Sequence, residues 1–290
     1  MAAEKGHTEC VARLLAHPAT DANRALQDGA TPLLIAACQG HTECVARLLA
    51  HPATDANAAA QSGVTPLYIA AYQGHTECVA RLLAHPATDA NRALQGGTTP
   101  LLIAACQGHA ECVARLLAHP ATDANAAAQS GATPLYIAAE KGHTECVARL
   151  LAHPATDANR ALQDGATPLW TAAYQGHTEC VARLLAHPAT DANAAAQSGA
   201  TPLYTAACQG HTECVARLLA HPATDTNRAK QDGATPLWTA ACQGHSECVA
   251  RLLAHSATDA NAAAQGGVTP LFVAAEKGHM ECVARLLAHP

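Results

Sequence analysis

Apolar residues gather in two short clusters that return every 34 residues along the chain. The first cluster follows Thr31-Pro32 and repeats at i, i+3 and i+4 from Leu33, which is the spacing of one helix face. The second follows Gly40-His41 and runs from Cys44 to Leu49. A polar stretch separates each period from the next. The pattern therefore predicts two short amphipathic helices in every repeat.

Residues that start and stop helices stand at the edges of both clusters. Thr31 is a hydroxyl N-cap before Pro32, a residue that suits the first helical position. Gly40 supplies a left-handed end to the first helix. Thr42 is expected to cap the second helix, and Pro52 ends it. Each repeat thus predicts a helix–turn–helix followed by a polar finger turn.

The 34-residue spacing is constant along the whole chain. Thr-Pro-Leu begins at Thr31, Thr65, Thr99, Thr133, Thr167, Thr201, Thr235 and Thr269, and Gly-His recurs from Gly6 to Gly278. A fixed period of this size indicates stacked supersecondary units. We expect one array over residues 1–290, with a partial repeat at 1–22 and eight repeats at 23–290. The polar turns alternate between an Arg-containing and an Ala-rich form, which indicates a 68-residue duplication.

Composition and charge limit the classes of partner that the chain is expected to bind. The formal net charge is −6 and no basic block occurs, so nucleic acid is not the expected partner. No apolar run approaches the roughly 18–20 residues of a membrane helix, so membrane insertion is not expected. The 13 cysteines follow the repeat rather than a disulfide framework. A reducing, intracellular and cytoplasmic location is the interpretation that follows.

The chain closely resembles ankyrin repeats. The resemblance is carried by Gly-x-Thr-Pro-Leu-x-x-Ala-Ala at Gly29 to Ala37, by Gly40-His41, by Leu48-Leu49 and by Asp55-Ala56-Asn57. It implies an all-α ankyrin-repeat solenoid that binds another protein through a concave helix face and its finger loops. Three features depart from the family. The repeat is one residue longer than the usual ankyrin period, the histidine after Thr-Pro-Leu is replaced by Leu, Tyr, Trp or Phe, and the finger aspartate is replaced by Leu, Ala or Lys.

Histidine and cysteine suggest metal or nucleophile chemistry by number alone. Each repeat carries one histidine after glycine and one before the Pro52 position, among 18 in total. Stacked repeats lie roughly 8–10 Å apart, too far for equivalent histidines to share one ion. Cys44 falls on the expected buried face, where a thiol is unreactive. We therefore expect no catalytic residues, no metal site and no cofactor.

The positions that vary between repeats point to a binding surface. The aromatic residues fall on the face that the resemblance places on the inner side, where hot spots are rich in Trp and Tyr. The alternative is that those after Thr-Pro-Leu pack between repeats. Three successive repeats also exchange the earlier isoleucine for threonine. The candidate protein-binding residues are Tyr72, Asp164, Trp170, Thr171, Tyr174, Tyr204, Thr205, Asp232, Trp238 and Thr239.

The sequence therefore predicts a non-catalytic scaffold for protein–protein interaction, with the partner's identity open. The alternative is a structural spacer, or a fragment of a larger multidomain ankyrin-repeat protein. The incomplete first repeat and the lack of polar outer faces favour that alternative, because terminal repeats normally need a polar outer face.

Overall fold

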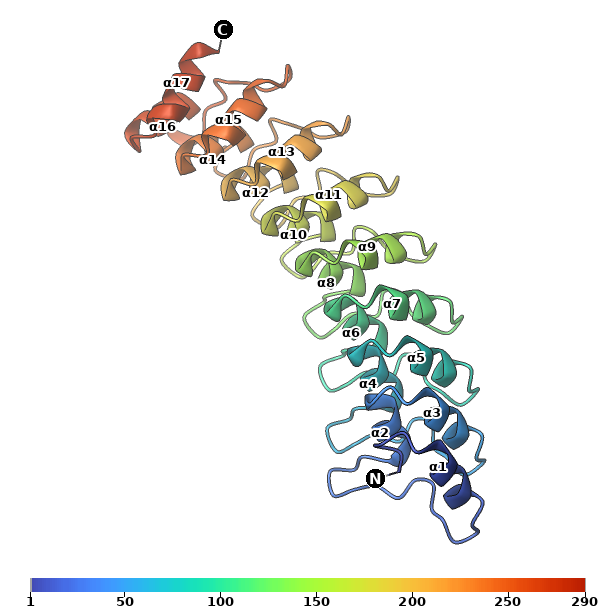
Figure 1. Cartoon of the computed structure of the whole chain (residues 1–290). Helices are drawn as coiled ribbons and strands as arrows, with labels where there is room; N and C mark the ends of the chain where they lie inside the picture. The colour runs from blue at the N-terminus through green and yellow to red at the C-terminus, as the bar shows by residue number, and fades with distance from the viewer. Residues whose placement is uncertain (1, 290) are drawn as a thin grey trace. The chain divides into compact units, whose positions relative to one another are not determined.

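The computed structural model describes residues 2–289, and within them the secondary structure is almost entirely helical (Figure 1). The first helices of the repeats are α2 Pro32–Cys38, α4 Pro66–Gln73, α6 Pro100–Gln107, α8 Pro134–Lys141, α10 Pro168–Gln175, α12 Pro202–Gln209, α14 Pro236–Gln243 and α16 Pro270–Glu276. The second helices are α1 Thr8–Leu15, α3 Thr42–Leu49, α5 Thr76–Leu83, α7 Ala110–Leu117, α9 Thr144–Leu151, α11 Thr178–Leu185, α13 Thr212–Leu219, α15 Ser246–Leu253 and α17 Met280–Ala288. A short 3₁₀ turn, η1, covers Gln265–Gly267. The all-α fold of helix–turn–helix repeats is confirmed.

The first helix of each repeat begins as its sequence predicts. In α10, Thr167 is the N-cap and its hydroxyl accepts a hydrogen bond from the Trp170 N–H at 3.2 Å. Pro168 follows at the first helical position, where its missing N–H costs nothing. Gly176 ends the helix with φ 78°, a left-handed conformation that glycine adopts without strain. The two signals fix this helix at eight residues.

The second helix begins differently from the prediction. Thr42 was expected to be the N-cap, but His41 occupies that position and its side chain makes no capping hydrogen bond. Thr42 already lies in the first turn, and its hydroxyl instead lies 3.6 Å from Cys78 Sγ of the next repeat. The capping prediction is therefore wrong, because the chain turns into the helix one residue earlier. The hydroxyl contributes to contact between repeats.

The described chain divides into two bodies: one runs up to Ile137 and includes Ala148–Thr156, and the other comprises Ala138–Val147 and the residues from Asp157 onward. In the first body α2, α4 and α6 pack in one row, and α1, α3, α5 and α7 in a second. The second body has the same two rows, with α10, α12, α14 and α16 in one and α11, α13, α15 and α17 in the other (Figure 1).

Each repeat from α2–α3 to α14–α15 buries one leucine of each helix almost completely. The largest fully buried side chains are Leu33, Leu48, Leu67, Leu82, Leu101, Leu116, Leu135, Leu150, Leu169, Leu184, Leu203 and Leu218. Burial of one such side chain stabilises a fold by about 1.5–3 kcal/mol. In these repeats the alanines at the Ala36 and Ala37 positions are fully buried as well, so neighbouring helices approach closely. The core is thus distributed along the chain, one small layer per repeat.

The turn after each second helix is tied to the next repeat by an asparagine side chain. Asn193 Nδ2 donates to the Ala223 carbonyl at 2.6 Å, and Asn193 Oδ1 accepts from the Asp225 N–H at 2.8 Å. Equivalent pairs of bonds begin at Asn23 and Asn57. The asparagine series therefore has a structural role in joining successive turns.

Candidate functional site

Both tryptophans of the chain bridge a first helix and the finger of the following repeat. Trp170 lies on α10 and is half-buried, and its indole Nε1–H donates to the Ala200 carbonyl at 3.0 Å. Trp238 on α14 makes the equivalent bond to the Val268 carbonyl, also at 3.0 Å. One part of each ring therefore packs between repeats, while the remainder stays accessible to solvent.

Tyr174 extends the surface that Trp170 begins. The two rings, one helical turn apart on α10, stack with their centroids 5.3 Å apart and their planes inclined by 8°. Tyr174 is 41% exposed. The stack therefore gives the second body a flat aromatic surface at the C-terminal end of α10.

Tyr204 stands at the centre of a small apolar cluster. It packs with Ala200 and Ala234, and Cys208 and Trp238 cover the edges of the group. Because Ala200 also receives the Trp170 hydrogen bond, the stack and this cluster adjoin. Tyr204 is only 9% exposed and therefore supports this surface from within, so we define the aromatic face as Trp170, Tyr174 and Trp238.

A lysine covers the ring of Tyr204. Lys230 Nζ lies 5.3 Å from the ring centroid and 3.4 Å from Asp232 Oδ2. Partial burial disfavours the charge of Lys230, but the neighbouring Tyr204 and Asp232 outweigh it and raise the pKa of this ammonium. Lys230 was not among the residues predicted from the sequence, although it is the one departure from leucine among the Arg-containing fingers. It places a fixed positive charge against the Tyr204 ring.

The two candidate aspartates shape their own fingers. Asp164 Oδ1 accepts from the Ala166 N–H at 3.0 Å, and Asp232 Oδ1 accepts from the Ala234 N–H at 3.1 Å. The backbone bond from Ala234, with the Lys230 charge, lowers the pKa of Asp232. Both side chains are exposed. They therefore hold the finger tips in shape at the edge of the aromatic face.

Backbone hydrogen bonds join the fingers in pairs. The Gln197 N–H donates to the Asp164 carbonyl at 2.7 Å, and the Gln265 N–H donates to the Asp232 carbonyl at 2.9 Å. In each pair an Arg-containing finger accepts from the Ala-rich finger that follows it. These backbone bonds follow the 68-residue alternation, whereas the glutamine side chains continue from one pair to the next, since Gln231 Nε2 donates to the Gln197 carbonyl at 2.9 Å.

The three candidate threonines lie below the surface. Thr171, Thr205 and Thr239 are only 2%, 4% and 2% exposed. Their hydroxyls do not reach solvent, and they are left out of the proposed site. Tyr72 is 41% exposed on α4, which lies in the first body.

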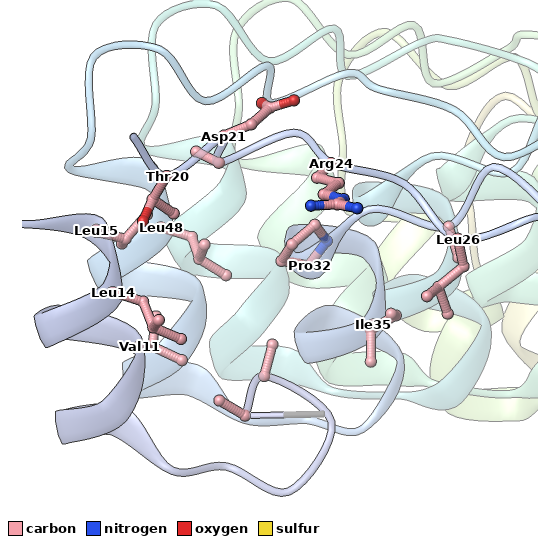
Figure 2. Close-up of a pocket in the computed structure, with 14 residues that line it drawn as sticks. Val11, Leu14, Leu15, Thr20, Asp21, Arg24, Leu26, Pro32, Ile35 and Leu48 are labelled. Carbon is pink, nitrogen blue, oxygen red and sulfur yellow. The ribbon is translucent and has the colours of Figure 1, made fainter. Parts of the chain in front are cut away.

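A cavity of about 280 Å³ lies in the first body, beside α1 and α2. Figure 2 shows Val11 and Leu14 of α1 on one side of it, and Pro32 and Ile35 of α2 on another. Leu14 is 54% exposed, whereas the equivalent Leu48 is 2% exposed, because in complete repeats a first helix fills this space. The cavity has an apolar lining and carries no arrangement of catalytic groups.

The histidines after glycine serve the contact between repeats. His211 Nε2 lies 2.9 Å from the Tyr174 carbonyl, and His245 Nε2 lies 3.0 Å from the Cys208 carbonyl. Among residues 2–289, no three His, Cys, Asp or Glu side chains lie close enough together to hold a metal ion. In the same described part of the chain, no helix has the length and apolar content needed to cross a membrane.

Comparison with models of known protein families finds one match. The model for ankyrin repeats, in sets of three copies, matches residues 1–93, 86–161, 150–229 and 222–290. No curated protein matches the chain.

Proposed function

The chain belongs to the ankyrin-repeat family, and on this premise we propose that it is a non-catalytic scaffold that binds a partner protein through the aromatic face and the adjoining fingers. Ankyrin repeats are generally protein-interaction modules and typically lack catalytic activity. We also propose a cytoplasmic location, because the cysteines from Cys10 to Cys282 are free thiols, as a reducing compartment would keep them.

The observation that carries this proposal is the exposed stack of Trp170 and Tyr174 beside the Tyr204 cluster. At the Tyr174 position most other repeats have cysteine or glutamate, so the aromatic ring is not required by the repeat itself. Aromatic side chains that are held rigid and partly exposed supply much of the energy at protein interfaces. The surrounding finger tips add polar groups at the rim.

The test is selection of binding peptides followed by mapping. A phage-displayed library of random 12-residue peptides is selected on the full chain, and hydrogen exchange is measured with and without the best synthetic peptide. We expect added protection in α10, α12 and the fingers at 159–166 and 227–234, and at least tenfold weaker binding by Tyr174→Ala. Tyr72→Ala is the control and should bind normally. Protection confined to the second helices, or no selected peptide, would overturn the proposal.

A further inference from the structure

The aromatic face spans three successive first helices that pack directly on one another. Trp170 and Tyr174 lie on α10 and Trp238 lies on α14, with α12 between these helices and in contact with both. On α12 the half-buried Cys208 packs against the Tyr204 cluster, which Trp238 also contacts. The accessible rings therefore stand two repeats apart, with a smaller apolar side chain between them.

The helices that carry this face are uncharged. Residues 167–176, 201–210 and 235–244 contain no Asp, Glu, Lys or Arg. Lys230, which lies over the Tyr204 ring, is paired with Asp232 at 3.4 Å. The next helix of the row, α16, ends on Glu276, which Lys277 follows with the opposite charge. A charged side chain buried on α10, α12 or α14 would lose its water without meeting an opposite charge. Charge complementarity therefore favours an uncharged partner segment.

A free side-chain amide ends each of the same three helices. Gln175, Gln209 and Gln243 are exposed, and within residues 2–289 their amides have no hydrogen-bond partner. The finger glutamines differ, since Gln197 Nε2 donates to the Gln163 carbonyl at 2.6 Å. The three helix-end amides can therefore bond to a partner segment that leaves its own backbone groups unpaired.

The spacing of the repeats selects the conformation of such a segment. Packed helices lie about 8–10 Å apart. A polyproline II helix has roughly three residues per turn and a rise of about 3.1 Å, so one turn covers about 9.3 Å and shows the same side to each repeat. An extended strand also covers about 10 Å in three residues, but every third side chain points the opposite way. An α-helix pairs its own backbone groups and would leave the glutamine amides unused.

Resting on the proposed function, we propose that the partner segment on the aromatic face is an uncharged, proline-rich segment in the polyproline II conformation. Two turns of this helix cover about 18.6 Å and two helix-packing intervals about 16–20 Å, so prolines about six residues apart reach both accessible aromatic groups. One proline packs on the Trp170–Tyr174 stack and the other on Trp238, while a small apolar residue midway faces Cys208. The glutamine amides donate to carbonyls of the segment, which makes no internal hydrogen bonds.

The experiment uses the selected 12-residue peptides and the full chain under reducing conditions. Peptides that need Tyr174 should carry prolines about three or six residues apart, with no charged residue between them, and their circular dichroism should show polyproline II. Alanine at both prolines should raise the Kd at least tenfold, because the preformed conformation and the ring contacts are lost together. Between about 50 and 500 mM sodium chloride the Kd should change less than about twofold, because no charges pair.

Variants of the chain test the two kinds of contact separately. Gln209→Ala leaves the rings in place and should weaken binding roughly threefold through one lost hydrogen bond. Trp238→Ala should weaken binding at least tenfold, and Trp238→Phe, which keeps a ring for the proline, should recover most of that loss. Gln73→Ala is the matched control, since Gln73 ends α4 in the first body and follows Tyr72 as Gln175 follows Tyr174. It should bind normally, and urea unfolding shows that each variant is folded.

The failures can be told apart. Peptides that protect the aromatic face but tolerate alanine at their prolines, or that bind as α-helices, would overturn the polyproline proposal and leave the proposed function standing. Peptides that need charged residues and weaken as salt rises would do the same, as would normal binding by Gln209→Ala. The absence of any peptide that protects the aromatic face would overturn both proposals.

Discussion

The imidazole of His177 lies against the backbone of Gly142 in the preceding repeat, so closely that a Cβ on Gly142 would come within 2.7 Å of His177 Nδ1. Nε2 of the same ring lies 3.0 Å from the Glu140 carbonyl. Gly176 and His211 repeat the relationship one step further along the chain. The Gly-His pair of the sequence thus works between repeats, with each glycine making room for the next histidine.

Replacement of Gly142 by alanine should destabilise the protein for two separable reasons. Gly142 has φ +75°, and an L-residue there costs about 1–2 kcal/mol. The methyl group would also meet the His177 ring. Gly278→Ala is the control, since φ is +76° but nothing lies within 4 Å. In urea unfolding Gly142→Ala should lose more free energy than Gly278→Ala, and equal losses would mean that the ring yields freely.

The role of the asparagine series in joining repeats can be tested by comparing Asn193 with Asn261. Asn193→Ala removes two bonds to the next turn, to the Ala223 carbonyl and from the Asp225 N–H. We expect a loss of about 1–3 kcal/mol in the free energy of unfolding. Asn261 holds the same position in the last repeat, and its side chain has no hydrogen-bond partner within residues 2–289. Asn261→Ala should therefore be nearly neutral, and a similar loss for both variants would contradict a role in joining repeats.

Most of the fold could be predicted because the residues that start and end each helix lie in or next to that helix. Thr167, Pro168 and Gly176 act within a single helix, so a short stretch of sequence contains all that is needed to place them. The role of Thr42 could not be predicted in this way. Its hydroxyl contacts Cys78, a residue 36 positions away in sequence, and the backbone at His41 decides which residue starts the helix.

The candidate site could be predicted only in part for the same reason. Periodicity placed Thr171 and Tyr174 on one helix face, but it does not show which part of that face a neighbouring repeat covers. In the structure Thr171 is buried while Tyr174 is exposed. The contact of Lys230 with Tyr204 depends on the reach of the following finger. Such inter-repeat contacts follow from stacking geometry, which a single repeat does not contain.

Stability should fall in alkaline solution because of the buried thiols. Burial raises the pKa of Cys180 and Cys214, and hydrogen bonds from Thr144 and Thr178 offset this only partly. In the unfolded chain a thiol ionises near about pH 8.5, while the folded thiol stays neutral to higher pH. Their stabilisation is complete below that pH and is lost as pH rises toward the folded pKa. Urea unfolding under reducing conditions should show a falling free energy from pH 8 to 10.

The control for this pH dependence is the variant Cys180→Ala/Cys214→Ala. It should be less stable at pH 7, because two buried side chains are truncated, and its free energy of unfolding should decline less steeply above pH 8. An unchanged slope would mean that other groups, such as Tyr68, whose pKa burial also raises, govern the alkaline transition.

The contribution of the Trp170–Tyr174 stack to stability can be measured by comparing Tyr174 with Tyr72. Tyr174 and Tyr72 occupy the same repeat position and are each 41% exposed, but within residues 2–289 only Tyr174 has a stacked ring beside it. Tyr174→Ala should therefore lower the free energy of unfolding by about 0.5–1.5 kcal/mol more than Tyr72→Ala does. Tyr174→Leu keeps apolar area without the stack and should recover little of that difference. Equal losses for Tyr174→Ala and Tyr72→Ala would show that the Trp170 stack contributes nothing to folding, and that its area is available in full to a partner.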